Sequence, residues 1–357
     1  MVGAHGMKVA ITGATGNVGT SVIRVLQNEP AVGSIVGIAR RQPEVRTPKV
    51  TWRRGDIVTD DLVPLFEGCD VVVHLAWLIQ PSRDLQILQD TNVEGSRRVF
   101  RAAAAAGVRS LVYASSIGAY SPGPKDDVGV DESWPTEGIP SSFYSRHKAE
   151  TESILDAFER DNPRMRVVRL RPGLIFKRES AAEVRRLFFG PLLPGTLLRR
   201  SLIPFVPDMD GLRFQVVHSL DVGEAYRLAI VKGVSGAFNV AADPVMDPKR
   251  LGELLGARPV KVPPRLVKIG ADVTWKLRLQ PTPSGWLDMA LQVPVMDVTR
   301  ARTELGWKPR FDAGDAILEL MEGLRDGAGM DTPPLDPKAG GPGRVRELLT
   351  RVGGTSR

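Results

Sequence analysis

The sequence predicts an α/β fold in which a doubly wound parallel sheet is joined to a smaller C-terminal domain. Two observations carry this prediction. Short runs rich in Val, Ile and Leu alternate with longer helical segments, such as 17–27 and 85–106. The strand-like runs are also continuously apolar, which is typical of parallel strands covered by helices on both faces. These runs are Lys8–Thr12, Ser34–Ala39, Asp70–Ala76, Ser110–Ser116 and Met165–Arg171.

The composition of the chain changes after Arg171, where prolines and glycines become frequent. A strand–helix–strand pattern over 214–243 interrupts this region and is expected to return to the main sheet. We therefore expect a dinucleotide-binding domain over 7–173 with 214–243, and a substrate-binding domain over 174–213 with 244–325. A Gly/Pro-rich tail over 326–357 is expected to follow the second domain.

Composition narrows the class of protein. The chain has 357 residues, of which 42% are hydrophobic and 25% charged, the usual mix for a globular protein. Its apolar stretches are far shorter than the ~18 residues of a membrane span. The single cysteine, Cys69, excludes a disulfide framework, and the four histidines show no ligand spacing, so we expect no metal. A cytoplasmic protein that does not enter the membrane fits this composition.

The basic charge is dispersed. The net charge of +7 comes from 48 basic and 41 acidic residues. The basic residues form scattered doublets, such as Arg40-Arg41 and Arg97-Arg98, without interleaved aromatic residues. This pattern indicates a solvated basic surface rather than a nucleic-acid site.

The first strand ends in a glycine-rich turn. The stretch "ITGATGNVG" places Gly13, Gly16 and Gly19 between a strand and a helix. Glycines there permit a tight turn and let the backbone approach a diphosphate at the helix N-terminus. The turn therefore predicts a Rossmann-type dinucleotide site, with Thr15, Asn17 and Val18 in the same loop.

Several further stretches follow in order, and together they resemble the extended short-chain dehydrogenase/reductase superfamily and its NAD(P)-dependent epimerase/dehydratase family. The resemblance covers roughly 7–326. It rests on the spacing G-x-x-G-x-x-G and on "GDI" (55–57), "HLA" (74–76), "NVEGSRRV" (92–99), "SSIGAY" (115–120), "YSRHK" (144–148), "RLRPGLIF" (169–176), "VVHSLDVGEA" (216–225) and "DVTRARTELGWKP" (297–309).

The resemblance implies further contacts with the cofactor. Asp56 would contact the adenine amino group, and Asn92 would order the active-site backbone. The remaining residues implied to line the cofactor are Ile57, Leu75, Ala76, Tyr144, Lys148, Pro172 and Gly173.

The end of the second strand bears on the choice of cofactor. NAD-preferring enzymes usually carry a carboxylate there for the ribose diol, whereas this chain has Arg40 and Arg41. A guanidinium matches a 2′-phosphate in charge and geometry. We expect NADP(H) to be preferred, with NAD(H) possible.

The resemblance implies that Tyr144 and Lys148 are the proton-transfer pair, and residues four apart share one face of a helix, so the two side chains can lie together. A free phenol has a pKa of about 10, and a nearby cation is expected to lower it. The resemblance adds Ser116 as the residue that hydrogen-bonds the substrate oxygen. Ser115 is the competing serine. His74 and His218 are expected to be structural.

The predicted reaction is hydride transfer between nicotinamide and a ketone or secondary alcohol. Trp77 and Ile117 are expected to line the substrate site with Ser116, and the apolar stretch 187–195 favours a small, partly apolar substrate. A nucleotide-sugar epimerase or dehydratase and a dinucleotide-binding redox sensor are the alternatives. The resemblance also implies a possible homodimer through the helices that begin near Asn92 and Tyr144.

Overall fold

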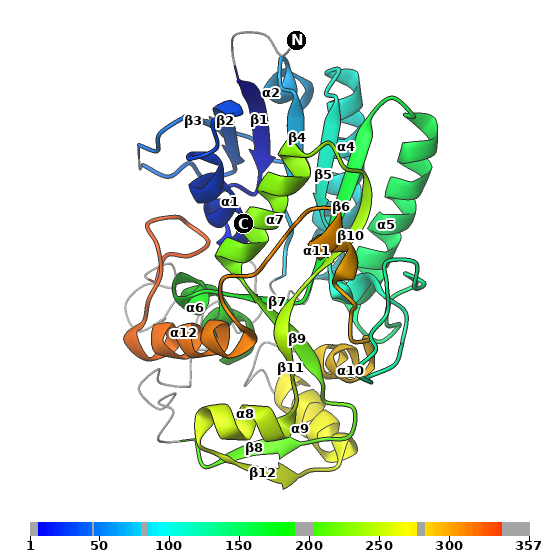
Figure 1. The fold of residues 1–357 in the computed structure, drawn as a ribbon, viewed down its shortest axis with the longest axis vertical. Coiled ribbons are helices and arrows are strands. Elements are labelled where there is room, and N and C mark those ends of the chain that lie inside the picture. Colours follow the sequence, from blue (N-terminus) through cyan, green and yellow to red (C-terminus); the bar gives the residue numbers. More distant parts are fainter. Residues whose placement is uncertain (1–5, 45, 80–83, 190–202, 277–282, 338–357) are drawn as a thin grey trace.

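The computed structural model describes residues 6–44, 46–79, 84–189, 203–276 and 283–337 (Figure 1). Two expected features lie partly outside the described residues. Part of the apolar stretch 187–195 falls in the range 190–202, and most of the expected tail falls in 338–357.

A seven-stranded parallel sheet forms the centre of the fold, in the order β10-β6-β5-β4-β1-β2-β3. β1 lies between β2 and β4, with Ile11 paired to Gly37 on one side and Val73 on the other. The strand order reverses at β1, and ligands of open α/β sheets bind beside such a switch point. The predicted fold class is confirmed. The strands are β1 (Met7–Thr12), β2 (Val32–Ala39), β3 (Val50–Arg54), β4 (Val71–His74), β5 (Ser110–Ala114), β6 (Arg166–Pro172) and β10 (Gly236–Val240).

Helices cover both faces of this sheet (Figure 1). Alternate residues of a strand point to opposite faces, so Val9 and Ile11 enter one core cluster and Ala10 enters the other. The first cluster includes side chains of α1 and α7, and the second includes side chains of α2, α4 and α5. These helices are α1 (Asn17–Leu26), α2 (Val63–Phe66), α4 (Gly95–Ala105), α5 (Phe143–Asp161) and α7 (Ser219–Val231); α3 (Leu85–Gln89) and a π-helical turn, η1 (Asp90–Glu94), precede α4.

Most of the remaining elements gather below the sheet in Figure 1, whereas α11 (Thr299–Thr303) lies beside β10. A three-stranded sheet, β11-β9-β7, and a two-stranded sheet, β12-β8, lie there with their helices. Leu335, within the predicted tail, is fully buried. The elements are β7 (Leu174–Phe176), η3 (Arg178–Ser180), α6 (Ala181–Val184), η4 (Arg185–Phe189), β8 (Phe205–Asp208), β9 (Phe214–His218), β11 (Ala242–Met246), α8 (Pro248–Leu255), β12 (Arg258–Lys261), α9 (Pro264–Lys276), α10 (Gly285–Gln292), α11 (Thr299–Thr303) and α12 (Ala313–Asp326); the short helix η2 (Ile117–Ala119) follows β5.

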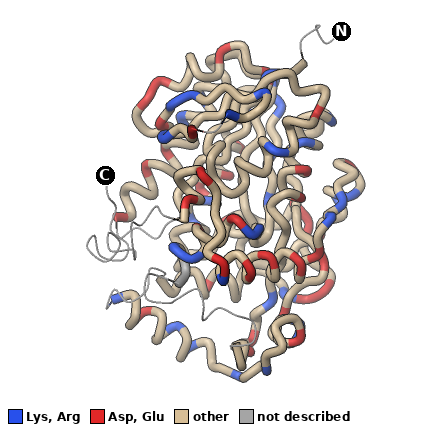
Figure 2. Tube along the Cα trace, turned by 90° about the vertical axis from the view of Figure 1, so that its left-hand side faces the viewer, with Lys and Arg blue, Asp and Glu red and all other residues tan. Residues whose placement is uncertain are grey.

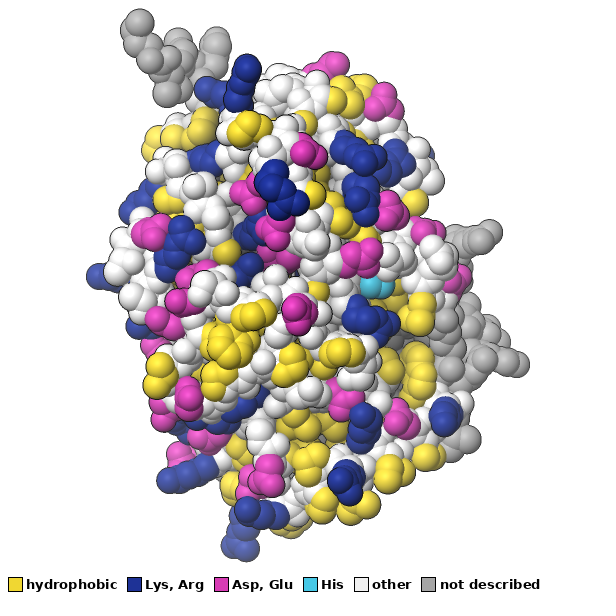
Figure 3. Space-filling view, turned by 90° about the vertical axis from the view of Figure 1, so that its right-hand side faces the viewer, with side chains coloured by type: hydrophobic (Ala, Val, Ile, Leu, Met, Phe, Trp, Pro, Cys, Tyr) yellow, Lys and Arg dark blue, Asp and Glu magenta, His cyan; other side chains and the backbone are white. Residues whose placement is uncertain are grey.

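Charges of both signs are interspersed along the trace (Figure 2) and over the face shown in Figure 3. None of the described helices combines the length and apolar character that a membrane crossing requires. Within the described residues, no group of three or more His, Cys, Asp or Glu side chains is placed to hold a metal ion.

Candidate functional site

The glycine loop lies between β1 and α1, at the switch point. Gly13 has a φ of +70°, and a Cβ there would lie 2.6 Å from the Ala76 nitrogen. A Cβ on Gly19 would lie 2.4 Å from the Gly13 oxygen, so neither glycine tolerates a side chain. At Gly16 the nearest atom to an added Cβ is 3.5 Å away. The loop thus packs against β1 and β4 on two glycines and leaves space beside the third.

The space beside Gly16 suits an anion. Gly16 caps α1 without a side-chain hydrogen bond, so the first-turn N–H groups keep their capacity to bind a phosphate. Asn17 donates from Nδ2 to the Ile175 oxygen at 3.2 Å, and its buried Oδ1 has no partner among the described residues. Thr15 is buried beneath the loop, and Val18 lies in the first turn. A dinucleotide diphosphate fits this cradle.

Lys177 adds a buried cation to the same corner, and the sequence reading missed it. Its Nζ donates to the Asn17 oxygen at 3.0 Å and to the hydroxyls of Thr20 and Ser21 at 2.7 and 3.1 Å. Burial lowers the pKa of this amine to about 8. The contact of Lys177 with the glycine loop joins segments about 160 residues apart. No local sequence pattern around residue 177 indicates it.

The other predicted cofactor residues lie along the same sheet edge. Arg40 and Arg41 are exposed directly after β2. Asp56 and Ile57 follow β3, where Asp56 accepts from the Val58 nitrogen at 2.9 Å and Ile57 is buried. Leu75 and Ala76 follow β4, Pro172 is the last residue of β6, and Gly173 follows it.

Tyr144 and Lys148 lie in the first turns of α5, which Ser142 caps by accepting from the Ser145 nitrogen. The Tyr144 ring passes so close to Gly118 that a Cβ on this glycine would lie 2.8 Å from it. Lys148 is 3% exposed and donates to the Ala114 oxygen at 2.7 Å, with Nζ 5.9 Å from the centre of the Tyr144 ring. The structure therefore brings the predicted pair together at the end of β5.

The two candidate serines have different partners. Ser115 donates to a carboxylate oxygen of Glu152 at 2.5 Å. Ser116 accepts from the Gly118 nitrogen at 3.0 Å, and its side chain is close enough to Tyr144 to lower the pKa of the phenol. Ser116 therefore faces the phenol, whereas Ser115 belongs to a buried charge network behind it.

The expected lowering of the Tyr144 pKa is not found. Desolvation raises the pKa of Tyr144 to about 12, and the hydrogen bond with Ser116 opposes this only in part. Burial also lowers the pKa of Lys148 well below its ordinary value, so the expected cation is itself disfavoured. In this state Tyr144 is a protonated phenol at neutral pH.

Aromatic side chains surround the phenol. The Tyr144 ring lies 5.0 Å from Trp286 of α10 and 6.1 Å from Trp77, measured between ring centres. Met289, also on α10, and Ile117 complete an apolar cluster with Tyr144. Trp286 and Met289 were missed by the sequence reading, because they lie more than 140 residues from Tyr144 and carry no motif.

Asn92 holds the segment that carries Trp77. The Asn92 side chain is fully buried on the π-helical turn η1, accepts from the Leu78 nitrogen at 2.7 Å and donates to the Leu78 oxygen at 3.0 Å. π-helical turns recur at functional sites because they redirect one side chain. Asn92 therefore orders the backbone after β4, as expected.

A buried ion network underlies the site. Glu152 accepts from Arg169 at 2.8 Å and from Arg171 at 2.9 and 3.1 Å, and all three side chains are at most 6% exposed. Both arginines and the Ser115 hydroxyl hold the pKa of Glu152 down to about 2 although burial alone would raise it. The network ties α5 to β6 and to the end of β5.

The histidines at the sheet edge are held by structural contacts. His74 contacts the Thr12 hydroxyl at 2.7 Å and the Ser96 hydroxyl at 2.9 Å through its two ring nitrogens. Burial lowers the pKa of His74 to about 3, so the ring is neutral. His218 caps α7 and lies 3.1 Å from a carboxylate oxygen of Glu319.

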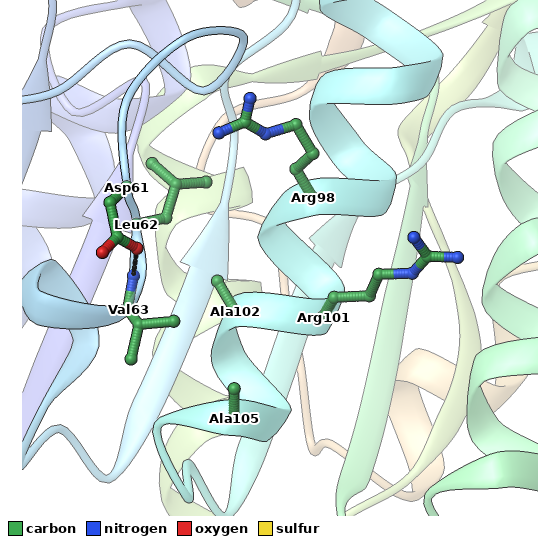
Figure 4. A pocket seen from close by; sticks show the side chains of 7 residues that line it. All are labelled: Asp61, Leu62, Val63, Arg98, Arg101, Ala102 and Ala105. Atoms are coloured by element: carbon green, nitrogen blue, oxygen red, sulfur yellow. Dashed lines mark hydrogen bonds between the residues drawn. The ribbon is translucent and has the colours of Figure 1, made fainter.

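A shallow pocket elsewhere contains none of these groups. Asp61, Leu62 and Val63 line one side of it, and Arg98, Arg101, Ala102 and Ala105 of α4 line the other (Figure 4). Because it lies between α4 and the segment that begins α2, and shares no residue with the groups described above, this pocket is separate from the candidate site.

Comparison with known proteins identifies the family. The model of the NAD dependent epimerase/dehydratase family matches residues 9–241, and the chain belongs to this family. The match confirms the family that the sequence motifs predicted.

Relatives of known sequence agree with this assignment. An uncharacterised protein of Mycobacterium tuberculosis, Rv2047c, is 27% identical over 91% of this chain, but the chain spans only 31% of that protein's length. The sterol-4-alpha-carboxylate 3-dehydrogenase of Candida albicans is 31% identical over 47% of this chain and 50% of its own.

Solved structures share the fold. The crystal structure of gox2253 has a TM-score of 0.69 at 22% identity and covers 90% of this chain and 99% of its own. The UDP-glucose 4-epimerase of Thermotoga maritima has a TM-score of 0.68 at 19% identity, with the same coverage.

Proposed function

We propose that the protein is an NADP(H)-preferring oxidoreductase that interconverts a ketone and a secondary alcohol on a small, largely apolar substrate. One observation carries the proposal: Ser116 and the phenol of Tyr144 lie at the end of β5 beside an apolar wall of Trp77, Trp286 and Met289, close enough for the Ser116 side chain to lower the pKa of the phenol. A carbonyl oxygen between the two hydroxyls would be polarised while its substituents contact aromatic surface.

Each residue has a distinct task in this reaction. A bound nicotinamide dinucleotide supplies or accepts the hydride. Ser116 donates a hydrogen bond to the carbonyl oxygen and orients it, and Tyr144 transfers its phenolic proton to that oxygen as the alcohol forms. Lys148 holds the ribose hydroxyls of the cofactor and supports the phenolate that Tyr144 becomes.

The electrostatics favour the reducing direction near neutral pH. A phenol with a pKa of about 12 retains its proton, and ketone reduction needs a proton donor at this position. Alcohol oxidation needs the phenolate, so its rate should increase about tenfold per pH unit over the alkaline range below that pKa. The glycine cradle beside Gly16 would hold the diphosphate.

The cofactor preference rests on Arg40 and Arg41. Their exposed guanidinium groups follow β2, where a 2′-phosphate would form charge-assisted hydrogen bonds. Arg40→Ala should weaken NADPH binding roughly tenfold and leave NADH binding unchanged, since one such bond contributes about 1.5 kcal/mol. Arg101→Ala, an equal charge change on the exposed face of α4, is the matched control. An unaltered NADPH/NADH ratio in Arg40→Ala would remove the basis for this preference.

The reaction class is tested by following NADPH absorbance with ketones, aldehydes and nucleotide sugars. The proposal predicts stoichiometric NADPH consumption with an apolar ketone. Interconversion of a nucleotide sugar with no net change in the cofactor would instead establish an epimerase. The homodimer through α4 and α5 stays a prediction that light scattering can measure.

A further inference from the structure

Trp77 lies directly on the lysine of the candidate site. Lys148 Nζ is 3.4 Å from the centre of the Trp77 ring, and the Tyr113 ring centre is 5.2 Å away. Burial disfavours the charged form of Lys148, and the indole face opposes this effect because it attracts the protonated amine by a cation–π contact, which is strongest for tryptophan. The indole therefore covers the one amine that the proposed reaction requires to be available to the cofactor.

The indole is held on a fixed backbone but lacks a partner for its own polar atom. Asn92 binds both the nitrogen and the oxygen of Leu78, so the chain next to Trp77 is anchored. Trp77 Nε1 is buried and has no hydrogen-bond acceptor among the residues that the structure describes. A buried N–H without an acceptor costs free energy. Apart from its contact with Lys148, this position of the indole is therefore unfavourable.

We infer that Trp77 is a displaceable positioning residue, whose indole must leave Lys148 before the nicotinamide half of a dinucleotide can bind there. This inference rests on the proposed function, because it assigns Lys148 to the cofactor. Trp77 also contacts the Tyr144 ring, so its displacement rearranges the apolar wall beside the phenol. The consequence is an order of binding in which the cofactor enters first and the substrate binds to the rearranged wall.

The inference predicts a gain of affinity, which damage to the fold cannot produce. Trp77→Ala removes the group that competes for Lys148, so the full-length variant should bind NADPH about 5- to 10-fold more tightly than the wild type in calorimetric titration. Trp286→Ala is the matched control, since it removes an indole that touches Tyr144 rather than Lys148. NADPH affinity in this control should stay within about twofold of the wild type.

A kinetic measurement gives a second readout. In stopped-flow mixing, the observed binding rate of the wild type should level off at high NADPH concentration, where displacement of the indole becomes limiting, whereas that of Trp77→Ala should keep rising. Equal or weaker NADPH binding by Trp77→Ala would overturn the inference while leaving the proposed function intact. A wild-type protein that binds neither NADPH nor NADH would overturn both.

Discussion

Replacing Glu152 with glutamine tests the ion network that supports the candidate site. The Glu152 side chain is 1% exposed, and its two partner guanidinium groups, on Arg169 and Arg171, are each 6% exposed. The difference between the ordinary pKa of 4.5 and about 2 corresponds to roughly 3 kcal/mol in favour of the buried carboxylate. Removing one partner of such a network costs about 3–5 kcal/mol because the remaining charges stay buried. We expect Glu152→Gln to lower the free energy of unfolding by about 3 kcal/mol.

The matched control uses the same arginine. Asp156 lies 2.6 Å from Arg169, but its side chain is 53% exposed, so Asp156→Asn should cost less than about 1 kcal/mol. Urea unfolding of both variants, followed by circular dichroism, gives the comparison. Equal losses in the two variants would refute the argument that burial sets the strength of this network.

Two further predictions concern acid stability and the glycine loop. Because folding lowers the pKa of Glu152, its contribution to the free energy of unfolding should be complete above about pH 5 and should be lost as the pH falls from 4.5 towards 2. Midpoints of urea unfolding at several pH values can follow this loss. The midpoint of Glu152→Gln should depend less on pH over this range. Gly16→Ala should fold normally but bind NADPH at least about tenfold more weakly, because its methyl group has room only in the empty cradle. Gly19→Ala should instead lower the melting temperature, since its methyl group meets the Gly13 backbone at 2.4 Å; the reverse pattern would contradict the assignment of the cradle.

The sheet and the position of the site were predictable because they depend on local patterns. Apolar strands alternating with helices predict a parallel sheet, and in such a sheet the carboxyl ends of all strands meet at one edge. The loop at Gly13 could therefore be placed from its strand–turn–helix context. Helical spacing puts Tyr144 and Lys148 on one face of α5, but their place beside the cofactor came from the family resemblance.

The environment of the site was not predictable from those patterns. Trp286 reaches Tyr144 from a helix more than 140 residues away, and a single tryptophan in a sequence has no periodicity that reveals such a contact. Glu152 reads in the sequence as an ordinary helix-surface charge, although the fold buries it between two arginines. The direction of the Tyr144 pKa shift in the protein alone depends on rings from distant segments that exclude water, whereas the expected lowering rested on Lys148 together with the positive charge of the nicotinamide.

The most direct test of the proposed reaction compares the wild type with Tyr144→Phe in an NADPH-coupled assay on an apolar ketone. The proposal predicts that the wild type oxidises one NADPH per alcohol formed. Tyr144→Phe should lose about 10²- to 10⁴-fold in kcat, the usual contribution of a positioned proton donor, with an unchanged Kd for NADPH. A kcat of Tyr144→Phe equal to that of the wild type would contradict the proposed role of Tyr144 as proton donor.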